Sequence, residues 1–309
     1  MTTLVSVPCD LCGQDKIIPL FKDGGFQYVR CSACELMYLN PRPTEEMLMR
    51  WYEQHGSTSE PFQLQARQKN YYQRYIENKE GYLQEGGRFL QRIQSVEIGR
   101  GRLLDVGCAA GFYLSVFKNA GWEACGLELS EFFVNYALQT LHVNVQRTGV
   151  IDAVLQDQFF DAVLAIDVLS HFASPRKVLE KIYRILKEGG VLLLRTGNKG
   201  ALLRKEDGER WGETWGAPEH LYHFSEKTLK RLLKEVGFRI QVFQTYANVE
   251  NVISPESLHL PEAVYRFHKV LRRPYRLLKA LLTRTAGRWL RNTNLSGTIF
   301  VLATKVAEK

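Results

Sequence analysis

Four cysteines near the start of the chain form two closely spaced pairs. The first pair is Cys9 and Cys12, the second is Cys31 and Cys34, and 18 residues lie between the pairs. Two Cys-x-x-Cys pairs at this spacing are typical of a tetrahedral four-cysteine zinc site. A closed shell of four thiolates leaves no position open for a substrate. We therefore expect a structural zinc ion, which stabilises a segment too short to bury much surface of its own.

A second group of candidate residues lies in the segment RLLDVGCAAGFYL, residues 102–114. Asp105 ends an apolar run, and Gly107 and Gly111 permit the sharp turn and close ligand approach that follow a strand in an open parallel sheet. A dinucleotide site would require the spacing G-x-G-x-x-G, which is absent here, and the acid would repel phosphates. The turn therefore predicts a ligand without phosphate groups and with a polar or positively charged end.

Glu128 ends the next apolar run, 23 residues after Asp105. In nucleotide-binding folds a carboxylate at this place accepts hydrogen bonds from both hydroxyls of a ribose. The two acids together predict a ligand that carries a ribose.

The elements that would position these residues follow from the hydrophobic pattern. Short apolar runs alternate with amphipathic stretches between residues 100 and 197, which predicts an α/β fold with a parallel sheet covered by helices on both faces. The expected strands are 102–106, 124–129, 143–146, 159–167, 191–196, 238–246 and 297–305. The expected helices are 111–121, 130–141, 174–190 and 225–237.

Four motifs in this order resemble the class I S-adenosylmethionine (SAM)-dependent methyltransferases: LLDVGCAAG, GLELS, FDAVLAIDVLSHF and ILKEGGVLLLRT. The resemblance covers about residues 100–245 and the final strand. It implies a Rossmann-like sheet and SAM as cofactor. Ala109 stands where that family most often has glycine, and because a methyl group is a small intrusion we expect SAM binding to survive. The alternative is a Rossmann-like fold that does not bind SAM.

The same resemblance implies a role for each candidate residue of the cofactor site. Gly107 and Gly111 would line the methionine end of SAM, with Asp105 near it and Asp167 facing it. Glu128 would hold the ribose. The adenine ring would lie beside Leu129 and between Val150 and Ile151.

Two further phrases resemble bacterial methyltransferases that modify sugars or related small molecules, including sugar C-methyltransferases. They are VRCSACELMYLNPRP after the second cysteine pair and EHLYHFS at residues 219–225. The resemblance implies that Glu219 and His220 are the catalytic pair. Ala217 stands where that group commonly has a tyrosine.

Methyl transfer needs proximity and a deprotonated acceptor, and a histidine is a natural base for a hydroxyl or an acidic carbon. The candidate catalytic residues are His220, Glu219, His171 and Tyr222. Glu219 would bind substrate or tune the histidine. The alternative is that His220 only bonds a neighbouring loop and that His171 only shapes the pocket. Trp211 and Trp215 would stack on the acceptor or form a lid.

Three regions follow from these patterns: a zinc ribbon at 1–43, a helical linker or cap at 44–97 and a methyltransferase domain at 98–309. A basic helical insertion interrupts the last region at about 251–295. The chain of 309 residues carries a net charge of +8, but nine Lys or Arg and no acid lie between residues 263 and 291. The remainder is therefore nearly neutral. No membrane-spanning run or signal peptide is evident, so we expect a cytoplasmic protein.

The basic insertion has apolar residues at helical spacing, interrupted at Pro274. A helical cap with a solvated basic face is the favoured interpretation. The alternative is binding to an anionic membrane surface through residues 263–291, which would place the protein peripherally at the membrane and favour a lipid-linked acceptor.

These observations favour methyl transfer to a small-molecule acceptor such as a sugar nucleotide or a surface-glycan or lipid-linked precursor. An RNA methyltransferase that uses the ribbon and the insertion is the alternative. Nucleic acid is disfavoured because the basic charge is confined to one segment. A non-catalytic SAM-binding module is the second alternative. The sequence leaves the oligomeric state open.

Overall fold

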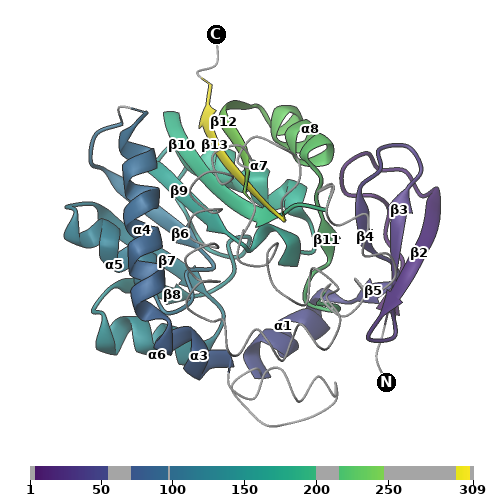
Figure 1. Cartoon of the computed structure of the whole chain (residues 1–309), viewed down its shortest axis with the longest axis horizontal. Coiled ribbons are helices and arrows are strands. Elements are labelled where there is room, and N and C mark those ends of the chain that lie inside the picture. The colour runs from purple at the N-terminus through teal and green to yellow at the C-terminus, as the bar shows by residue number, and fades with distance from the viewer. Residues whose placement is uncertain (1–3, 55–70, 97, 200–215, 247–296, 307–309) are drawn as a thin grey trace, which may run out of the picture.

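A seven-stranded sheet forms the centre of the molecule (Figure 1). The computed structural model describes residues 4–54, 71–96, 98–199, 216–246 and 297–306. The strand order is β12-β13-β10-β9-β6-β7-β8, in which β13 runs antiparallel to both neighbours and the other adjacent pairs are parallel. The strands are β6 (Arg102–Val106), β7 (Glu123–Glu128), β8 (Asn144–Arg147), β9 (Phe160–Ile166), β10 (Leu186–Gly197), β12 (Phe238–Tyr246) and β13 (Thr298–Lys305). The predicted Rossmann-like sheet is confirmed.

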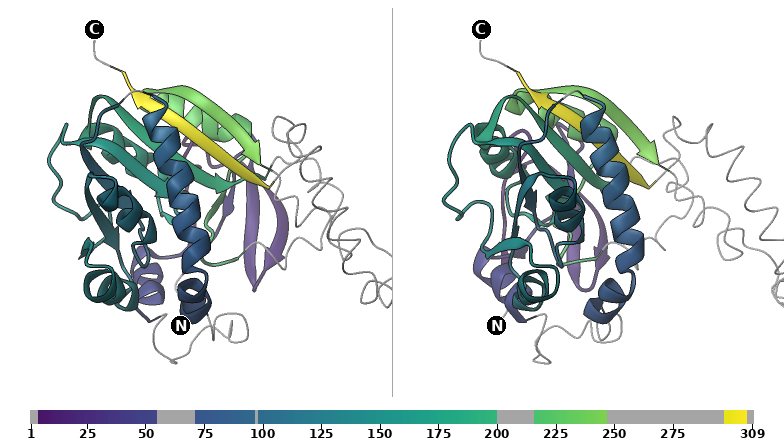
Figure 2. Two further views of the ribbon diagram at one scale, coloured as in Figure 1. Left: turned by 60° about the vertical axis from the view of Figure 1, so that its left-hand side comes forward. Right: turned by 90° about the vertical axis from the view of Figure 1, so that its left-hand side faces the viewer.

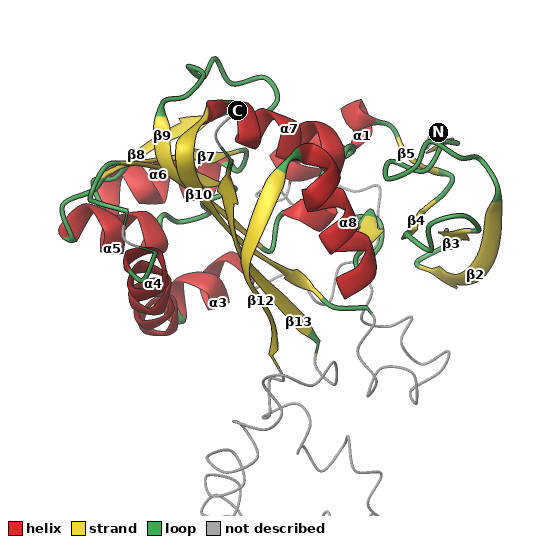
Figure 3. Cartoon of the chain, turned by 90° about the horizontal axis from the view of Figure 1, so that it is seen from above, coloured by secondary structure: helices red, strands yellow, loops and turns green. Residues whose placement is uncertain are grey.

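Helices cover both faces of this sheet (Figure 3). One face packs on α4 (Lys79–Gln94), α5 (Phe112–Asn119) and α6 (Glu131–Thr140), where Leu103 and Leu193 share a buried cluster with Phe117. The opposite face packs on α7 (Pro175–Ile185) and α8 (Glu226–Val236), where Leu104 and Leu192 share a cluster with Ile182. Neighbouring residues of each strand thus point into different cores, which explains why the strands are continuously apolar.

The helix that the sequence predicts over 174–190 is shorter in the structure. Ser174 caps α7 by accepting a hydrogen bond from the Lys177 amide, and Pro175 begins the helix. The helix ends at Ile185, and Leu186 already pairs with Phe160 of β9. A register shift follows between Leu186 and Val191, around Gly189 with φ of 74°. The stretch is therefore the bulged start of β10 rather than the end of a helix.

The cysteine-containing segment forms a smaller, four-stranded sheet in the order β11-β4-β3-β2. Its strands are β2 (Ile17–Asp23), β3 (Phe26–Cys31), β4 (Met37–Leu39) and β11 (Tyr222–His223). A separate pair joins β1 (Leu4–Val5) to β5 (Arg42–Pro43), and α1 (Glu45–Gln54) follows. The edge strand β11 comes from the loop that carries the candidate catalytic residues. The small sheet therefore combines chain segments from both sides of the expected boundary at residue 43.

Along the chain, α3 (Tyr71–Glu77) and α4 follow α1 and precede β6. Figure 2 shows α4 lying along the large sheet. In its right-hand view the purple strands of the small sheet lie behind the large one. Within the described residues, no helix is both long and apolar enough to cross a membrane. The basic insertion, with residues 263–291, and both Trp211 and Trp215 lie outside the described residues.

Candidate active site and cysteine cluster

The turn after β6 is tightly bent and packed against the exit of β9. Gly107 and Gly111 have φ of 70° and 78°, in the left-handed region that favours glycine. A Cβ atom at Gly107 would lie 2.5 Å from a methyl carbon of Val168, which follows β9. Ala109 has φ of 46°, so this alanine is held in a conformation that costs about 1–2 kcal/mol for a residue with a Cβ atom.

Asp105 in β6 and Glu128 at the end of β7 are the two carboxylates that the sequence predicts for this site. Asp105 is 1% exposed, and its Oδ2 atom has no hydrogen-bond partner among the described residues. Burial, together with the charge of Glu128, raises the pKa of Asp105 to about 8. A buried carboxylate oxygen without a partner is costly, so Asp105 fits a site that receives a cationic or hydrogen-bond-donating ligand group.

Glu128 ends β7 and accepts three backbone hydrogen bonds. The amides of Leu129 and Ser130 each donate to Oε1 at 2.8 Å, and that of Ala109 donates to Oε2 at 2.9 Å. Burial raises the pKa of this carboxyl, while these amides act in the opposite direction. Because a carboxylate offers about four acceptor positions, one remains on Oε2 for a ligand hydroxyl.

The residues predicted to contact adenine are placed differently from one another. Leu129 is half-buried directly after Glu128, and the Arg147 side chain donates to its carbonyl at 3.2 Å. Val150 is buried in the core on the α7 and α8 face, whereas Ile151 is 47% exposed in the same loop. The contact of these residues with adenine stays a prediction.

Asp167, at the exit of β9, is held by an arginine that the sequence reasoning missed. Arg195 of β10 contacts Asp167 Oδ2 through Nη2 at 2.7 Å and also pairs with Glu85 of α4. The Tyr113 hydroxyl donates to Glu85 at 2.5 Å. The only sequence signal was a single cation within the apolar strand VLLLRT. This network fixes the orientation of Asp167, whose contact with the methionine end of SAM stays a prediction.

An aromatic cluster next to the turn was also missed. The rings of Tyr75 and Tyr82 stack on Phe112 with centroid distances of 5.7 and 5.8 Å, and Ala109 packs against the same cluster. The Ser130 hydroxyl donates to the Tyr72 hydroxyl at 3.4 Å. The spacing of tyrosines in KNYYQRYIENKEGY was a usable signal, because it predicts one face of a helix.

Three candidate catalytic residues lie together beyond β9. The carboxylate of Glu219 lies 3.8 Å from His171 Nδ1, the rings of His171 and His220 are 4.5 Å apart, and His220 Nδ1 lies 3.4 Å from the Ser170 hydroxyl. His171 ends the short helix η1 (Leu169–His171), which begins directly after Val168. Because Val168 contacts Gly107, these residues share one edge of the sheet with the turn after β6.

Burial lowers the pKa of both histidines. The pKa of His171 falls to about 4 for this reason alone. The pKa of His220 is lowered by burial and by His171, while the charges of Glu219 and Asp167 act in the opposite direction. Both imidazoles are therefore neutral at pH 7, and a neutral imidazole nitrogen can accept a proton.

Tyr222 occupies a different place from the other three candidates. Its side chain is 1% exposed, and its hydroxyl accepts a hydrogen bond from Arg42 at 2.7 Å and donates to the Ala173 carbonyl at 3.1 Å. Both hydrogen bonds lie within the junction between the small sheet and η1. These two bonds hold the Tyr222 hydroxyl within the junction, and the catalytic role of Tyr222 stays a prediction.

The four cysteines converge as their spacing predicts. All four Sγ atoms lie within 4.8 Å of one another, with 3.4 Å between Cys9 and Cys34 and between Cys12 and Cys31. None is in a disulfide. A tetrahedron with metal–sulfur distances of ~2.3 Å has edges of ~3.8 Å, so the cluster has the size and donor set for one metal ion.

Comparison with known proteins agrees with this arrangement. Residues 71–241, more than half of the chain, match the family described as methyltransferase domain. The chain belongs to this family. The matched domain includes the turn after β6, Glu128, η1 and the Glu219–His220 pair, and it supports SAM as the cofactor. The cysteine cluster lies outside the match.

The curated relatives match only about a third of this chain. The ubiquinone biosynthesis O-methyltransferase of Maricaulis maris is 30% identical over 106 residues, which are 32% of this chain and 41% of that protein. The protein of the same name from Xanthomonas oryzae is 30% identical over 110 residues, 34% of this chain and 46% of that protein. The matched segment thus spans less than half the length of either relative.

A solved SAM-dependent methyltransferase from Archaeoglobus fulgidus shares the fold. Its TM-score is 0.51 at 20% identity, and the superposition covers 76% of this chain and all of that one. The family match begins at residue 71 and therefore includes α3 and α4.

Proposed function

We propose that the protein transfers a methyl group from SAM to a small-molecule acceptor, with His220 as the base. The observation that carries this proposal is the position of the Glu219, His171 and His220 side chains at the edge of the sheet where Val168 packs on Gly107. In open α/β sheets ligands bind at this carboxyl edge. The proposed cofactor site and the proposed base therefore lie at the same edge of the sheet.

The residues of the turn would hold the cofactor. Asp105 offers a buried acceptor to the ammonium group of SAM, and Glu128 offers its remaining position to a ribose hydroxyl. SAM held by these residues would supply an electrophilic methyl group on a sulfonium. The protein's share of the chemistry is to orient the acceptor and to take its proton.

His220 is the residue that we propose takes that proton. Its Nδ1 atom faces the Ser170 hydroxyl, which leaves Nε2 for the acceptor. As the proton moves onto Nε2, the acceptor oxygen or carbon keeps the electron pair that forms the new bond to the methyl carbon. The negative charge of Glu219 favours the imidazolium that results, as the direction of its effect on the His220 pKa indicates. His171 stays neutral and contacts both Glu219 and His220.

Zinc is the metal that we propose for the cysteine cluster. Four thiolates within tetrahedral reach suit Zn²⁺, and a closed shell of this kind is structural. The cluster lies outside the methyltransferase match, in agreement with a stabilising role.

The acceptor is proposed as a small molecule that carries a hydroxyl or an acidic carbon. The curated relatives are named as O-methyltransferases of ubiquinone biosynthesis, which supports an acceptor of small size. A sugar nucleotide or a surface-glycan or lipid-linked precursor remains our preferred class, and RNA the alternative.

A labelled-methyl assay tests this proposal. Purified protein and labelled SAM are incubated with nucleotide sugars and other small molecules, lipids and RNA from a bacterial extract. The variant His220→Asn is compared with His142→Asn, a change at an exposed histidine. Label in the small-molecule or lipid fraction that is lost only in His220→Asn supports the proposal. Label in RNA contradicts the acceptor class, and SAM binding without transfer to any fraction contradicts the activity.

A further inference from the structure

The segment that carries His220 is part of the small sheet that holds the cysteines. Tyr222 and His223 form β11, whose register places them opposite Tyr38 and Met37 of β4. The turn Cys31–Cys34 connects β3 to β4, so the second cysteine pair ends only three residues before Met37. The metal-binding turn and the catalytic segment therefore flank the same short strand.

Backbone contacts fix the catalytic segment between this sheet and η1. The Tyr28 hydroxyl of β3 donates to the His220 carbonyl at 2.7 Å, and the Leu39 amide of β4 donates to the Leu221 carbonyl at 2.8 Å. On the other side, the Leu221 amide donates to the Ser170 carbonyl at 2.8 Å. Two of these three bonds come from strands of the cysteine-containing sheet.

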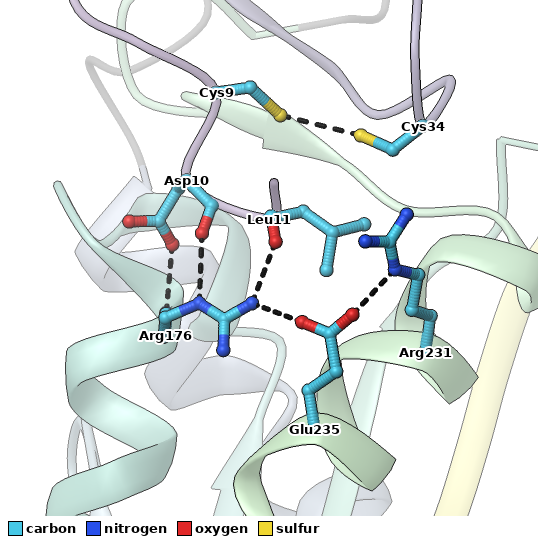
Figure 4. A network of polar contacts seen from close by, with 7 residues as sticks. All are labelled: Cys9, Asp10, Leu11, Cys34, Arg176, Arg231 and Glu235. Carbon is cyan, nitrogen blue, oxygen red and sulfur yellow. Dashed lines mark hydrogen bonds and ion pairs between the residues drawn. The ribbon is translucent and has the colours of Figure 1, made fainter. Parts of the chain in front are cut away.

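The first cysteine pair reaches the same region by a second route (Figure 4). Asp10 lies between Cys9 and Cys12, and its carboxylate accepts from the Ser174 hydroxyl at 2.6 Å and from the Arg176 amide at 2.9 Å. It thus satisfies an amide at the N-terminus of α7 that has no partner within the helix. Ser174 follows Ala173, whose carbonyl receives the Tyr222 hydroxyl.

Arg176 reinforces this route with its side chain. Its guanidinium donates to the carbonyls of Asp10 at 3.1 Å and Leu11 at 2.7 Å, and it pairs with Glu235 of α8 at 2.5 Å. Figure 4 shows the backbone carbonyls of Asp10 and Leu11 directed toward the Arg176 guanidinium. Both cysteine pairs are therefore bonded to elements that border η1 and the catalytic segment.

We propose that metal binding at the four cysteines positions the Glu219–His220 segment, and that Asp10 is a positioning residue that transmits this order to α7. The inference rests on the proposed function of His220. The turn after β6 has separate supports, because the amides of Gly107 and Cys108 donate to Leu127 and that of Ala109 donates to Glu128. Loss of the metal is therefore expected to release the catalytic segment while the proposed SAM site stays formed.

Amide hydrogen exchange on the full chain tests the coupling without an activity measurement. The zinc-loaded protein is compared with protein treated with a chelator and a non-thiol reductant. We expect exchange in residues 216–224 to rise about tenfold or more on metal removal, while residues 102–111 keep their protection. SAM affinity, measured by calorimetry, is expected to stay within about twofold. Unchanged exchange in 216–224, or equal loss of protection in both segments, overturns the proposal.

Variants at Asp10 separate the route through α7 from metal binding itself. Asp10→Ala removes the acceptor, Asp10→Asn keeps one amide oxygen, and Asp15→Ala changes an exposed acid of the same turn region. With metal content unchanged, we expect Asp10→Ala to raise exchange in 172–178 and 216–224 and to lower kcat about tenfold without a matching change in SAM affinity. Asp10→Asn should recover part of the loss, and Asp15→Ala should resemble the parent protein.

These readouts distinguish the inference from the proposed function. If no acceptor is ever methylated but exchange in 216–224 follows the metal, the proposed function fails and the coupling stands. If methylation depends on His220 but neither exchange in 216–224 nor kcat changes on Asp10 substitution or metal removal, the coupling is wrong and the proposed function stands.

Discussion

Asp105 combines complete burial with an oxygen that has no partner in the described part of the chain. Its pKa is raised to about 8, so at pH 7 the carboxyl is mostly protonated before ligand binding. A bound ammonium group stabilises the carboxylate and lowers that pKa, so SAM binding at pH 7 should release a proton. We expect Asp105→Asn to abolish this release and to weaken SAM binding about tenfold.

Calorimetry in buffers of different ionisation enthalpy measures this proton release directly. Asp152→Asn, at an exposed acid in the loop after β8, is the matched control and should keep the release. If the parent protein releases no proton at pH 7, Asp105 does not hold the ammonium group.

Ala109 is an alanine in the left-handed region of backbone conformation, where glycine is favoured. Its φ of 46° is strained for alanine and unstrained for glycine. We expect Ala109→Gly to raise the free energy of unfolding by about 1 kcal/mol. Ala110→Gly is the contrasting control, because Ala110 is fully buried without a left-handed φ, and it should lower that free energy. Chemical denaturation of the three proteins measures these free energies of unfolding. A lower free energy of unfolding for Ala109→Gly would contradict the prediction.

His220 and Glu219 give a prediction about pH. Because burial and His171 hold the His220 pKa below the ordinary value, the acidic limb of kcat/KM should lie below pH 6.5. The Glu219 charge raises that pKa, so Glu219→Gln should move the limb to still lower pH and reduce kcat about tenfold by weakening the base. A pH profile of both proteins measures the shift. A limb that moves to higher pH would show that Glu219 does not act through His220.

At the scale of elements, the strands of the large sheet and the turn after β6 were predictable because their residues are buried from both sides. Continuous apolar runs such as residues 162–166 leave little choice of structure. The helix expected over 174–190 was too long, since the amphipathic spacing continues to Leu186 while backbone pairing with Phe160 has already begun. Sequence periodicity cannot report a pairing between distant strands.

The site was predictable only in part for the same reason. The cysteine spacing and the Asp105–Gly111 turn are local signals, and the cysteines converge as expected. Strand β11 has two residues and is defined by its pairing with β4, so no local sequence pattern predicts it. The hydrogen bond between Tyr222 and Arg42 was not predictable either, because Arg42 is 180 residues away in the sequence. Arg195 and Glu85 were missed because their partners come from different elements.

At the scale of the whole molecule, the small sheet is joined to the helices of the large sheet by both covalent and non-covalent connections. The strand β11 belongs to the small sheet but continues into α8 of the large one, since Phe224 and Ser225 alone separate them. Arg176 bonds the first cysteine turn and Glu235 at once. When the metal-loaded protein is heated without a chelator, metal release should therefore coincide with unfolding of the large sheet. Removal of the metal by a chelator at low temperature is the separate case, in which the large sheet is expected to stay folded.

Replacing Arg176 should separate these two events. Arg176→Met removes the bonds to the carbonyls of Asp10 and Leu11 and leaves Glu235 paired with Arg231, which should destabilise the junction by about 2 kcal/mol. Metal release, followed with a chromogenic chelator, is then expected at a lower temperature than the main calorimetric transition. Arg184→Met, at a more exposed ion pair on the same helix, should keep the two coincident. Coincident transitions in Arg176→Met would mean that β11 alone suffices to join the sheets.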